Sequence, residues 1–192
     1  MSASLKPPVH MTVEEFLEWD PGDGQRYELV DGAPHAMAPG TTTHGFLQGE
    51  LSRRIGNHLR ERRSGCAVLV NPGVVPRVLA ADNYRVPDLA VTCSPLTTGQ
   101  LILPDPILII EILSPSNRAE TWANVRAYTS IPSVQEILVL HSTAIAAELL
   151  RRMPDGAWPE RTEEITSGTL ALDSIGFHMA LAELYDRTPL AR

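Results

Sequence analysis

The apolar run from Ile107 to Leu113 constrains the fold more than any other segment of the sequence. It reads ILIIEIL, and a strand of this composition is apolar on both faces, as a strand in the centre of a sheet is. Because side chains alternate along a strand, Glu111 shares a face with Ile109 and Leu113. An unpartnered ionised carboxylate there is costly, so we expect Glu111 to be protonated, paired or bound to a cation.

Periodic patterns on both sides of this run predict a mixed sheet flanked by helices. Apolar residues recur every four positions from Leu47 to Leu59, which predicts an amphipathic helix from Thr42 or Thr43 to about Arg62. A second helix is expected over 118–130, and strand-like segments occupy 66–79, with an interruption at 71–73, and 84–92, 107–113, 135–141, 144–152 and part of 161–172. This order predicts an α/β (α+β) fold with a mixed central β-sheet.

Shorter elements are expected near the ends of the chain. Thr12 and Glu15 form a capping-box pattern, which predicts a short helix over Val13–Trp19. Asp31-Gly32 lies between two alternating segments and predicts a β-hairpin. A last helix is expected near His178–Asp186. We divide the chain into a flexible tail, 1–10, and a single domain, 11–192.

Composition limits the function classes to consider. The 192 residues, 43% of them hydrophobic, suit one globular domain with a sizeable core. No apolar run is long enough to span a bilayer and no secretion signal opens the chain, so we expect no membrane contact and a cytoplasmic location. The net charge of −7 argues against a basic coat for nucleic acid, although local patches can oppose the overall sign.

Cysteine and lysine are scarce. Cys66 and Cys93 lack metal-pair spacing and are too few for a disulfide framework, so we expect two ordinary buried thiols in a reducing compartment. Of the sixteen basic residues only Lys6 is a lysine. A buried site in this chain must therefore draw its cations from arginine.

A second acid can meet Glu111 from a neighbouring strand. Asp88 follows Pro87 and precedes an apolar stretch, and the separation of 111 − 88 = 23 residues allows the two strands to lie side by side. Two acids that converge in a low-dielectric cleft repel each other, and a divalent metal removes that repulsion by binding both. Alternatively, an arginine or backbone donors satisfy Glu111, and Asp88 initiates a turn or holds Arg85.

Five motifs together resemble the Uma2 family. They are YELVDG at 27–32, THGFLQGEL at 43–51, VPDLAV at 86–91, IIEILSPS at 109–116 and, after a helix that ends in Ala127-Tyr128, EILVL at 136–140. The resemblance covers about residues 11–147. The Uma2 family is similar in fold to the PD-(D/E)XK nucleases, which implies a restriction-endonuclease-like core.

The resemblance also implies site residues and a cofactor. Asp88 and Glu111 would bind Mg²⁺ or Mn²⁺, and Glu28, His44 and Glu120 would be auxiliary catalytic residues. Each auxiliary residue has an alternative interpretation. Glu28 would face solvent from a hairpin, His44 would form only local hydrogen bonds at a helix start, and Glu120 would form a capping box with Asn117, the interpretation that we favour for Glu120.

One catalytic position departs from the superfamily. Its strand lysine, two residues after the acid, is Leu113 here. The resemblance implies that the lysine comes instead from the next helix, in a D-x-x-x-K-x-x-x-Y arrangement. The matching residues here are Glu120, Asn124 and Tyr128, so the helical lysine is absent too. The resemblance therefore implies a metal-dependent DNA nuclease whose turnover is weak or absent. The alternative is a non-catalytic module that binds nucleic acid or associates with itself.

Arginine residues on two predicted helices indicate where a nucleic-acid partner could bind. A basic end of the long helix and two arginines of the next helix can contact phosphates; these residues are Arg54, Arg60, Arg62, Arg63, Arg118 and Arg126. The alternative is a solvated charged face. DNA as a substrate is implied by the family. We also expect a homodimer, with the apolar strand Gln135–Leu140 at an edge.

Overall fold

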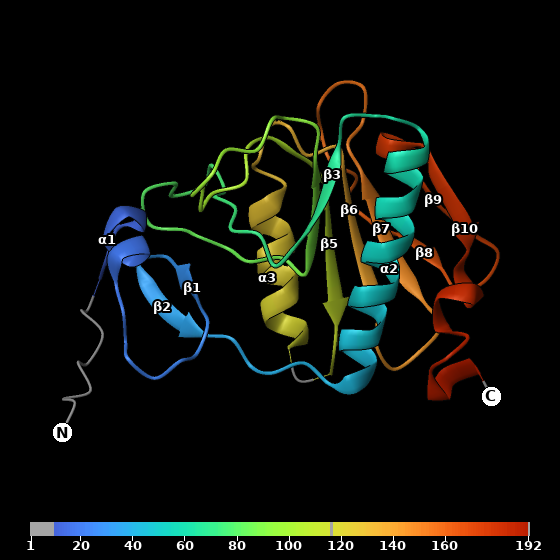
Figure 1. The fold of residues 1–192 in the computed structure, drawn as a ribbon, viewed down its shortest axis with the longest axis horizontal. Helices are drawn as coiled ribbons and strands as arrows, with labels where there is room; N and C mark the ends of the chain where they lie inside the picture. The colour runs from blue at the N-terminus through green and yellow to red at the C-terminus, as the bar shows by residue number, and fades with distance from the viewer. Residues whose placement is uncertain (1–9, 116, 192) are drawn as a thin grey trace.

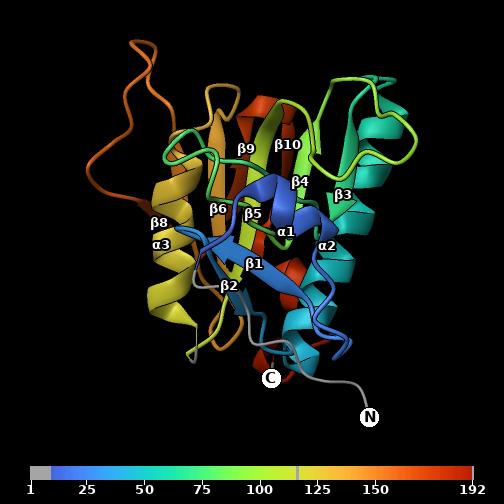
Figure 2. The same cartoon turned by 90° about the vertical axis from the view of Figure 1, so that its left-hand side faces the viewer.

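The structure, a computed structural model, describes residues 10–115 and 117–191. Its centre is a six-stranded mixed sheet with α2 (Thr42–Glu61) on one face and α3 (Arg118–Tyr128) on the other, as Figures 1 and 2 show. Of the predicted tail, 1–10, only His10 lies within the described residues. No described helix is both long and apolar enough to cross a membrane.

The sheet is mixed because one connection crosses over. Its strand order is β3 (Ala67–Val70), β4 (Leu89–Thr92), β5 (Pro106–Leu113), β6 (Glu136–His141), β7 (Ala147–Arg151) and β8 (Glu163–Ile165). The strands β5 and β6 are parallel and are joined through α3, whereas every other pair in this sheet is antiparallel. The predicted mixed sheet between helices is therefore confirmed.

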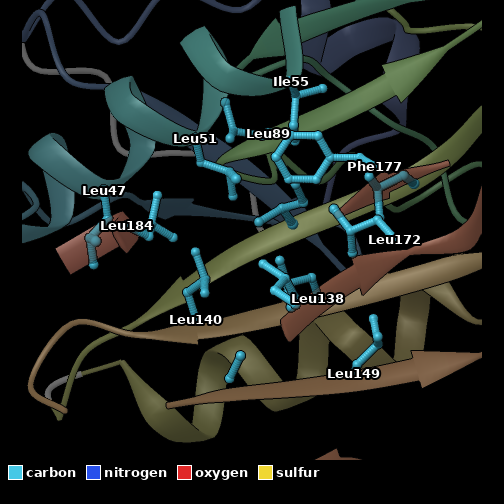
Figure 3. Close-up of a cluster of buried hydrophobic side chains, with 14 of the residues drawn as sticks. Leu47, Leu51, Ile55, Leu89, Leu138, Leu140, Leu149, Leu172, Phe177 and Leu184 are labelled. Atoms are coloured by element: carbon cyan, nitrogen blue, oxygen red, sulfur yellow. The ribbon is translucent and has the colours of Figure 1, made fainter. Parts of the chain in front are cut away.

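The two faces of β5 bury different clusters. Figure 3 shows the first, in which Leu47, Leu51 and Ile55 of α2 pack over β4, β5 and β6. Val125 and Tyr128 of α3 pack with Ile109 on the opposite face. The four-residue spacing in α2 is confirmed, since its four apolar positions are at most 4% exposed.

Two small hairpins and a short helix complete the fold. The hairpin of β1 (Tyr27–Val30) and β2 (Ala33–Ala36) lies beside the sheet, and β9 (Thr169–Leu172) pairs with β10 (Phe177–Ala180). The helix α1 (Val13–Glu18) begins with the predicted capping box. Gly32 has a φ of +79°, a conformation that L side chains rarely adopt, so this turn favours glycine.

Several secondary-structure predictions are wrong in detail. The expected helix at His178–Asp186 is the end of β10 followed by a short 3₁₀ helix, η2 (Leu181–Tyr185). Two more 3₁₀ turns are η1 (Asp173–Ile175) and η3 (Pro189–Ala191). The interruption predicted at 71–73 is confirmed, because β3 ends at Val70, Asn71 adopts a φ of 49° and Pro72 has no N–H to donate. Beyond it, isolated bridges at Gly73 and Val74 replace the expected strand. The segment 84–92 pairs regularly only in β4, with isolated bridges at Tyr84 and Arg85.

Two further predictions are contradicted. Cys66 and Cys93 form a disulfide across β3 and β4, and Cys93 is exposed, so neither is an ordinary buried thiol. Their facing positions at the ends of two paired strands bring them together. Residues Gln135–Leu140 do not lie at an edge, because β6 is between β5 and β7.

Candidate functional site

A cavity of about 210 Å³ opens between the start of α2, the β1–β2 hairpin and the start of α3. Its lining combines four carboxylates with amides, hydroxyls, one histidine and one arginine. The polar residues among those that line it are Arg26, Glu28, Thr41, His44, Gln48, Asn71, Asp88, Glu111, Asn117, Glu120, Thr121 and Asn124. All five predicted catalytic residues therefore lie at one cavity.

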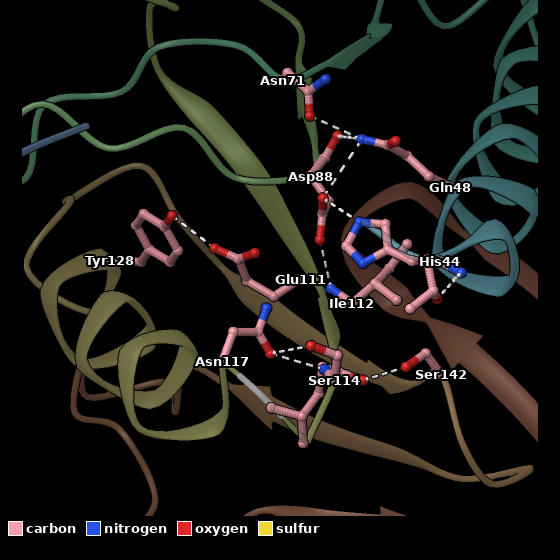
Figure 4. A network of polar contacts seen from close by, with 12 residues as sticks. His44, Gln48, Asn71, Asp88, Glu111, Ile112, Ser114, Asn117, Tyr128 and Ser142 are labelled. Atoms are coloured by element: carbon pink, nitrogen blue, oxygen red, sulfur yellow. Dashed lines mark hydrogen bonds and ion pairs between the residues drawn. The ribbon is translucent and has the colours of Figure 1, made fainter. Parts of the chain in front are cut away.

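Strand register brings Asp88 beside Glu111. Leu89 at the start of β4 pairs with Ile110 on the antiparallel strand β5. Asp88, just before Leu89, therefore faces Glu111, just after Ile110. One oxygen of Asp88, Oδ1, lies 2.8 Å from His44 Nε2, and Oδ2 accepts a hydrogen bond of 2.7 Å from the Ile112 backbone N–H (Figure 4). Both acids thus line the same cavity, and among the described residues neither forms an ion pair with an arginine.

Glu111 is a buried acid of the cavity whose pKa is strongly raised. It is 8% exposed, and its Oε1 accepts a hydrogen bond of 2.7 Å from the Tyr128 hydroxyl (Figure 4). Burial raises the pKa of Glu111 well above its ordinary value, and the charges of Asp88 and Glu28 raise it further. A positive charge placed between these acids would relieve that repulsion.

Glu28 is buried and does not face solvent. It is 3% exposed because the hairpin packs on the segment before β4, where Leu29 and Tyr84 form a bridge. Its Oε1 accepts 2.7 Å from the Val86 N–H, and its Oε2 accepts 3.1 Å from the Asn124 amide. Burial raises the pKa of Glu28, while these two donors and the charge of Arg85 oppose that rise.

The structure contradicts the alternative interpretations of His44 and Glu120. The His44 ring reaches across to Asp88, in addition to its backbone bond to Thr41. Asn117 begins α3 without a side-chain capping bond, because its Oδ1 accepts from the N–H and hydroxyl of Ser114. The capping box that we favoured for Glu120 is therefore wrong, and its side chain lines the cavity.

The basic end of α2 lies far from the cavity. His44 and Arg60 are sixteen residues apart on one helix, which corresponds to roughly 24 Å. Arg60 and Arg63 line a separate hollow beside Cys66. Arg54 pairs with Glu50 and Glu183 at 2.7 and 3.1 Å, so its charge is largely compensated. Three further predicted contacts, Arg62, Arg118 and Arg126, are exposed.

The lining also includes residues that were not predicted, among them Gln48, Asn71 and Arg26. Gln48 lies one turn after His44 on α2, and its Nε2 donates to Asn71 Oδ1 at 2.8 Å and to the Asp88 carbonyl at 2.9 Å (Figure 4). The four-residue spacing from His44 was a usable signal for Gln48. Asn71 and Arg26 carried no such signal, because only long-range packing brings them to the cavity.

The donors suit a hard divalent cation. Among the described residues no three His, Cys, Asp or Glu side chains already form a cluster that could hold a metal ion. Mg²⁺ in phosphoryl-transfer sites commonly takes only one or two protein carboxylates and completes its shell with water and phosphate oxygens. Asp88 and Glu111, which repel each other in a buried cavity, fit that requirement.

Comparison with known proteins gives matches over nearly the whole chain. A family model described as "Uma2: Putative restriction endonuclease" matches residues 13–182. The chain belongs to the Uma2 family. An uncharacterized protein of Synechocystis sp., slr1290, is 30% identical over 181 residues, which are 93% of each chain. The Uma2 resemblance drawn from the five motifs is thereby confirmed.

A solved structure shares the fold. A crystal structure described as "a putative nuclease belonging to DUF820" from Anabaena variabilis superposes with a TM-score of 0.73. It is 18% identical and covers 92% of this chain and 98% of that chain. The predicted α/β (α+β) restriction-endonuclease-like fold class is confirmed.

In this Uma2 chain, asparagine takes the place where the helical lysine was expected. Asn124 is 6% exposed and lies between Glu28 and Arg85, and it hydrogen-bonds to both. Arg85 donates to Asn124 and Asn83, so the interpretation that Asp88 holds Arg85 is wrong. Leu113 is buried on the α3 side of β5. Lys6 lies outside the described residues.

Proposed function

We propose that this Uma2 protein is a metal-dependent phosphodiesterase that acts on DNA. The observation that carries the proposal is the convergence of Asp88 and Glu111 in one polar cavity, where burial and mutual repulsion raise the pKa of Glu111 well above its ordinary value. An acid with a raised pKa in a polar cleft is typical of a functional site. The description of the family supports a phosphodiester as the substrate.

Asp88 and Glu111 would hold Mg²⁺ or Mn²⁺. When bound, the cation would polarise a phosphate oxygen and lower the pKa of a water molecule. His44 and the Ile112 N–H hold the Asp88 carboxylate in one orientation. The Tyr128 hydroxyl does the same for Glu111 through its bond to Oε1.

Glu28 is the best-placed group to orient an attacking water. Its carboxylate lines the cavity and is held by donors from Val86 and Asn124. Glu120 lines the same cavity and is exposed, so it can accept a hydrogen bond from a second water. Arg26 supplies a cation that can contact a phosphate.

A test uses metal binding and cleavage together. Titration calorimetry with Mn²⁺ is expected to show binding to the wild type and a large loss in Asp88→Asn and Glu111→Gln. Incubation with single- and double-stranded DNA is expected to show cleavage by the wild type and none by either variant. Glu164→Gln, which makes the same charge change at an exposed position on β8, is the control and should behave as wild type.

A non-catalytic module is the second candidate. Asn124 occupies the expected lysine position and bridges Glu28 and Arg85, and both Asp88 oxygens already accept hydrogen bonds. These contacts can serve to hold the hairpin and α3 on the sheet. If Mn²⁺ binds but no DNA is cut, the module is the better interpretation. If Mn²⁺ does not bind at millimolar concentration, the phosphodiesterase is excluded.

A further inference from the structure

Arg85 is a buried cation placed directly behind the cavity. It is 5% exposed, and it does not line the cavity. Its Nη1 donates to Asn124 Oδ1 at 2.9 Å and its Nη2 donates to Asn83 Oδ1 at 2.7 Å. Its Nε has no hydrogen-bond partner in the described part of the chain. A buried charge with an unsatisfied donor costs stability that an apolar residue would not, so stability alone does not explain Arg85.

The guanidinium sets the direction of a chain of hydrogen bonds. Because arginine has only donors, the carboxamide oxygen of Asn124 must face Arg85. The amide nitrogen of Asn124 then faces Glu28 and donates to Oε2 at 3.1 Å. The Val86 N–H donates to the other oxygen at 2.7 Å. Every hydrogen bond of this series is therefore donated toward Glu28. These bonds favour the carboxylate over the acid and oppose the burial that raises the pKa of Glu28.

Asn83 holds Arg85 in place from the other side. Its Nδ2 donates to the Asp31 carboxylate and to the Val78 and Leu79 carbonyls, so its Oδ1 is left to accept from Arg85 and from the Asp31 N–H. Asp31 belongs to the turn of the β1–β2 hairpin, whose strand β1 carries Glu28. The same asparagine thus connects the hairpin to the guanidinium.

We propose that Arg85 is a positioning residue that acts through Asn124 to hold Glu28 as an ionised acceptor directed into the cavity. The proposed role of Glu28 in orienting water rests on the proposed phosphodiesterase function, but the effect of Arg85 on the Glu28 carboxylate does not. Arg85 thereby supplies a buried positive charge behind the cavity, and the described residues include no lysine.

The variants separate this role from folding. Arg85→Met removes the charge and the donors, Arg85→Lys keeps a cationic donor, and Asn124→Asp keeps an acceptor for Arg85 but cannot donate to Glu28. Arg77→Met is the matched control, because Arg77 is exposed and away from the cavity. Circular dichroism and thermal melting show which variants are folded.

The first readout needs no activity. The carboxyl ¹³C signal of Glu28, assigned by its loss in Glu28→Gln, is recorded for the metal-free protein at pH 7. Wild type, Arg85→Lys and Arg77→Met are expected to show a carboxylate, and Arg85→Met and Asn124→Asp are expected to show a shift toward the acid. An unchanged Glu28 signal in folded Arg85→Met would overturn the proposal. If that variant does not fold, an unchanged signal in Asn124→Asp would overturn it.

The second readout is DNA cleavage with Mn²⁺. Arg85→Met and Asn124→Asp are expected to lose at least tenfold in kcat with KM within about threefold of wild type, and Arg85→Lys is expected to recover much of the loss. If the wild type cleaves no DNA, the phosphodiesterase function fails, while the Glu28 signal still decides the role of Arg85. Full cleavage by folded Arg85→Met would overturn the role in positioning.

Discussion

His44 Nε2 lies 2.8 Å from Asp88 Oδ1, although 44 residues of sequence separate the two side chains. The contact ties the first turns of α2 to the start of β4, as Figure 4 shows. Since Asp88 Oδ2 is held by the Ile112 N–H, the whole carboxylate has one orientation before any cation binds. A ligand that is already oriented loses little conformational entropy on binding.

His44→Ala is expected to weaken Mn²⁺ binding by about tenfold, because residues that orient a ligating carboxylate typically contribute that much. Titration calorimetry measures the change. The control is His58→Ala, which removes a second histidine of α2 whose ring contacts the Ile175 carbonyl and Phe177, away from the cavity. Equal Mn²⁺ affinity in wild type and His44→Ala would show that the contact only holds the helix.

Glu111 is expected to make the metal-free protein less stable as the pH rises. Its pKa is raised in the folded state, so above the ordinary value of 4.5 the unfolded chain ionises while the folded protein keeps the proton. The unfolded state then binds fewer protons, and the free energy of unfolding falls by up to about 1.4 kcal/mol per pH unit until the folded pKa is reached. Glu111→Gln should remove this decline.

Urea denaturation of both proteins between pH 5 and 8, without divalent metal, measures the effect. Glu111→Gln should become more stable than wild type as the pH rises, and added Mn²⁺ should stabilise only the wild type. Parallel curves for the two proteins would mean that Glu111 is ionised throughout.

Glu50 is expected to have the opposite pH dependence. The pKa of Glu50 is lowered from 4.5 to about 2, first by its hydrogen bond with Arg53 and then by Arg54 and the charges of both arginines. Burial opposes this change by raising the pKa. A lowered folded-state pKa gives stability that is present above pH 4.5 and is lost as the pH falls toward 2. Because Arg53 is mostly exposed, we expect Glu50→Gln to cost only about 1 kcal/mol at pH 7.

Urea denaturation at pH 7 and near pH 2.5 compares conditions in which the Glu50 carboxylate stabilises the fold with conditions in which that stabilisation is being lost. The difference between wild type and Glu50→Gln should shrink toward zero at the lower pH. A difference that stays constant over this range would assign the cost to lost packing.

Arg26, at the cavity, is expected to contribute more to cleavage than the basic end of α2. Arg26→Ala should raise the KM for DNA several-fold, and it should reduce the salt dependence of binding by about one phosphate contact. Arg60→Ala should change the KM less, because its position is roughly 24 Å from His44 along the helix. Steady-state kinetics at two salt concentrations measure both. A larger effect of Arg60→Ala would mean that a long DNA segment binds along α2.

Local patterns were enough to predict much of the fold. The spacing of Leu47, Leu51 and Ile55 predicts α2, because a helix repeats its contacts over adjacent turns. The capping box at Thr12 and the Asp31-Gly32 turn involve atoms only a few residues apart. The apolar faces of β5 likewise predict a central strand, and an acid within it predicts a site.

What only the tertiary structure decided depends on contacts between distant residues. Neither the burial of Glu28 nor its link to Arg85 through Asn124 has a local signal, since these residues come from β1, the segment before β4, and α3. The Cys66–Cys93 disulfide follows from strand pairing, and the 3₁₀ turn of η2 forms where a regular helix was expected. Sequence periodicity reports which face of an element is buried, but the charge and hydrogen-bond partners that a side chain meets there depend on which elements pack against it.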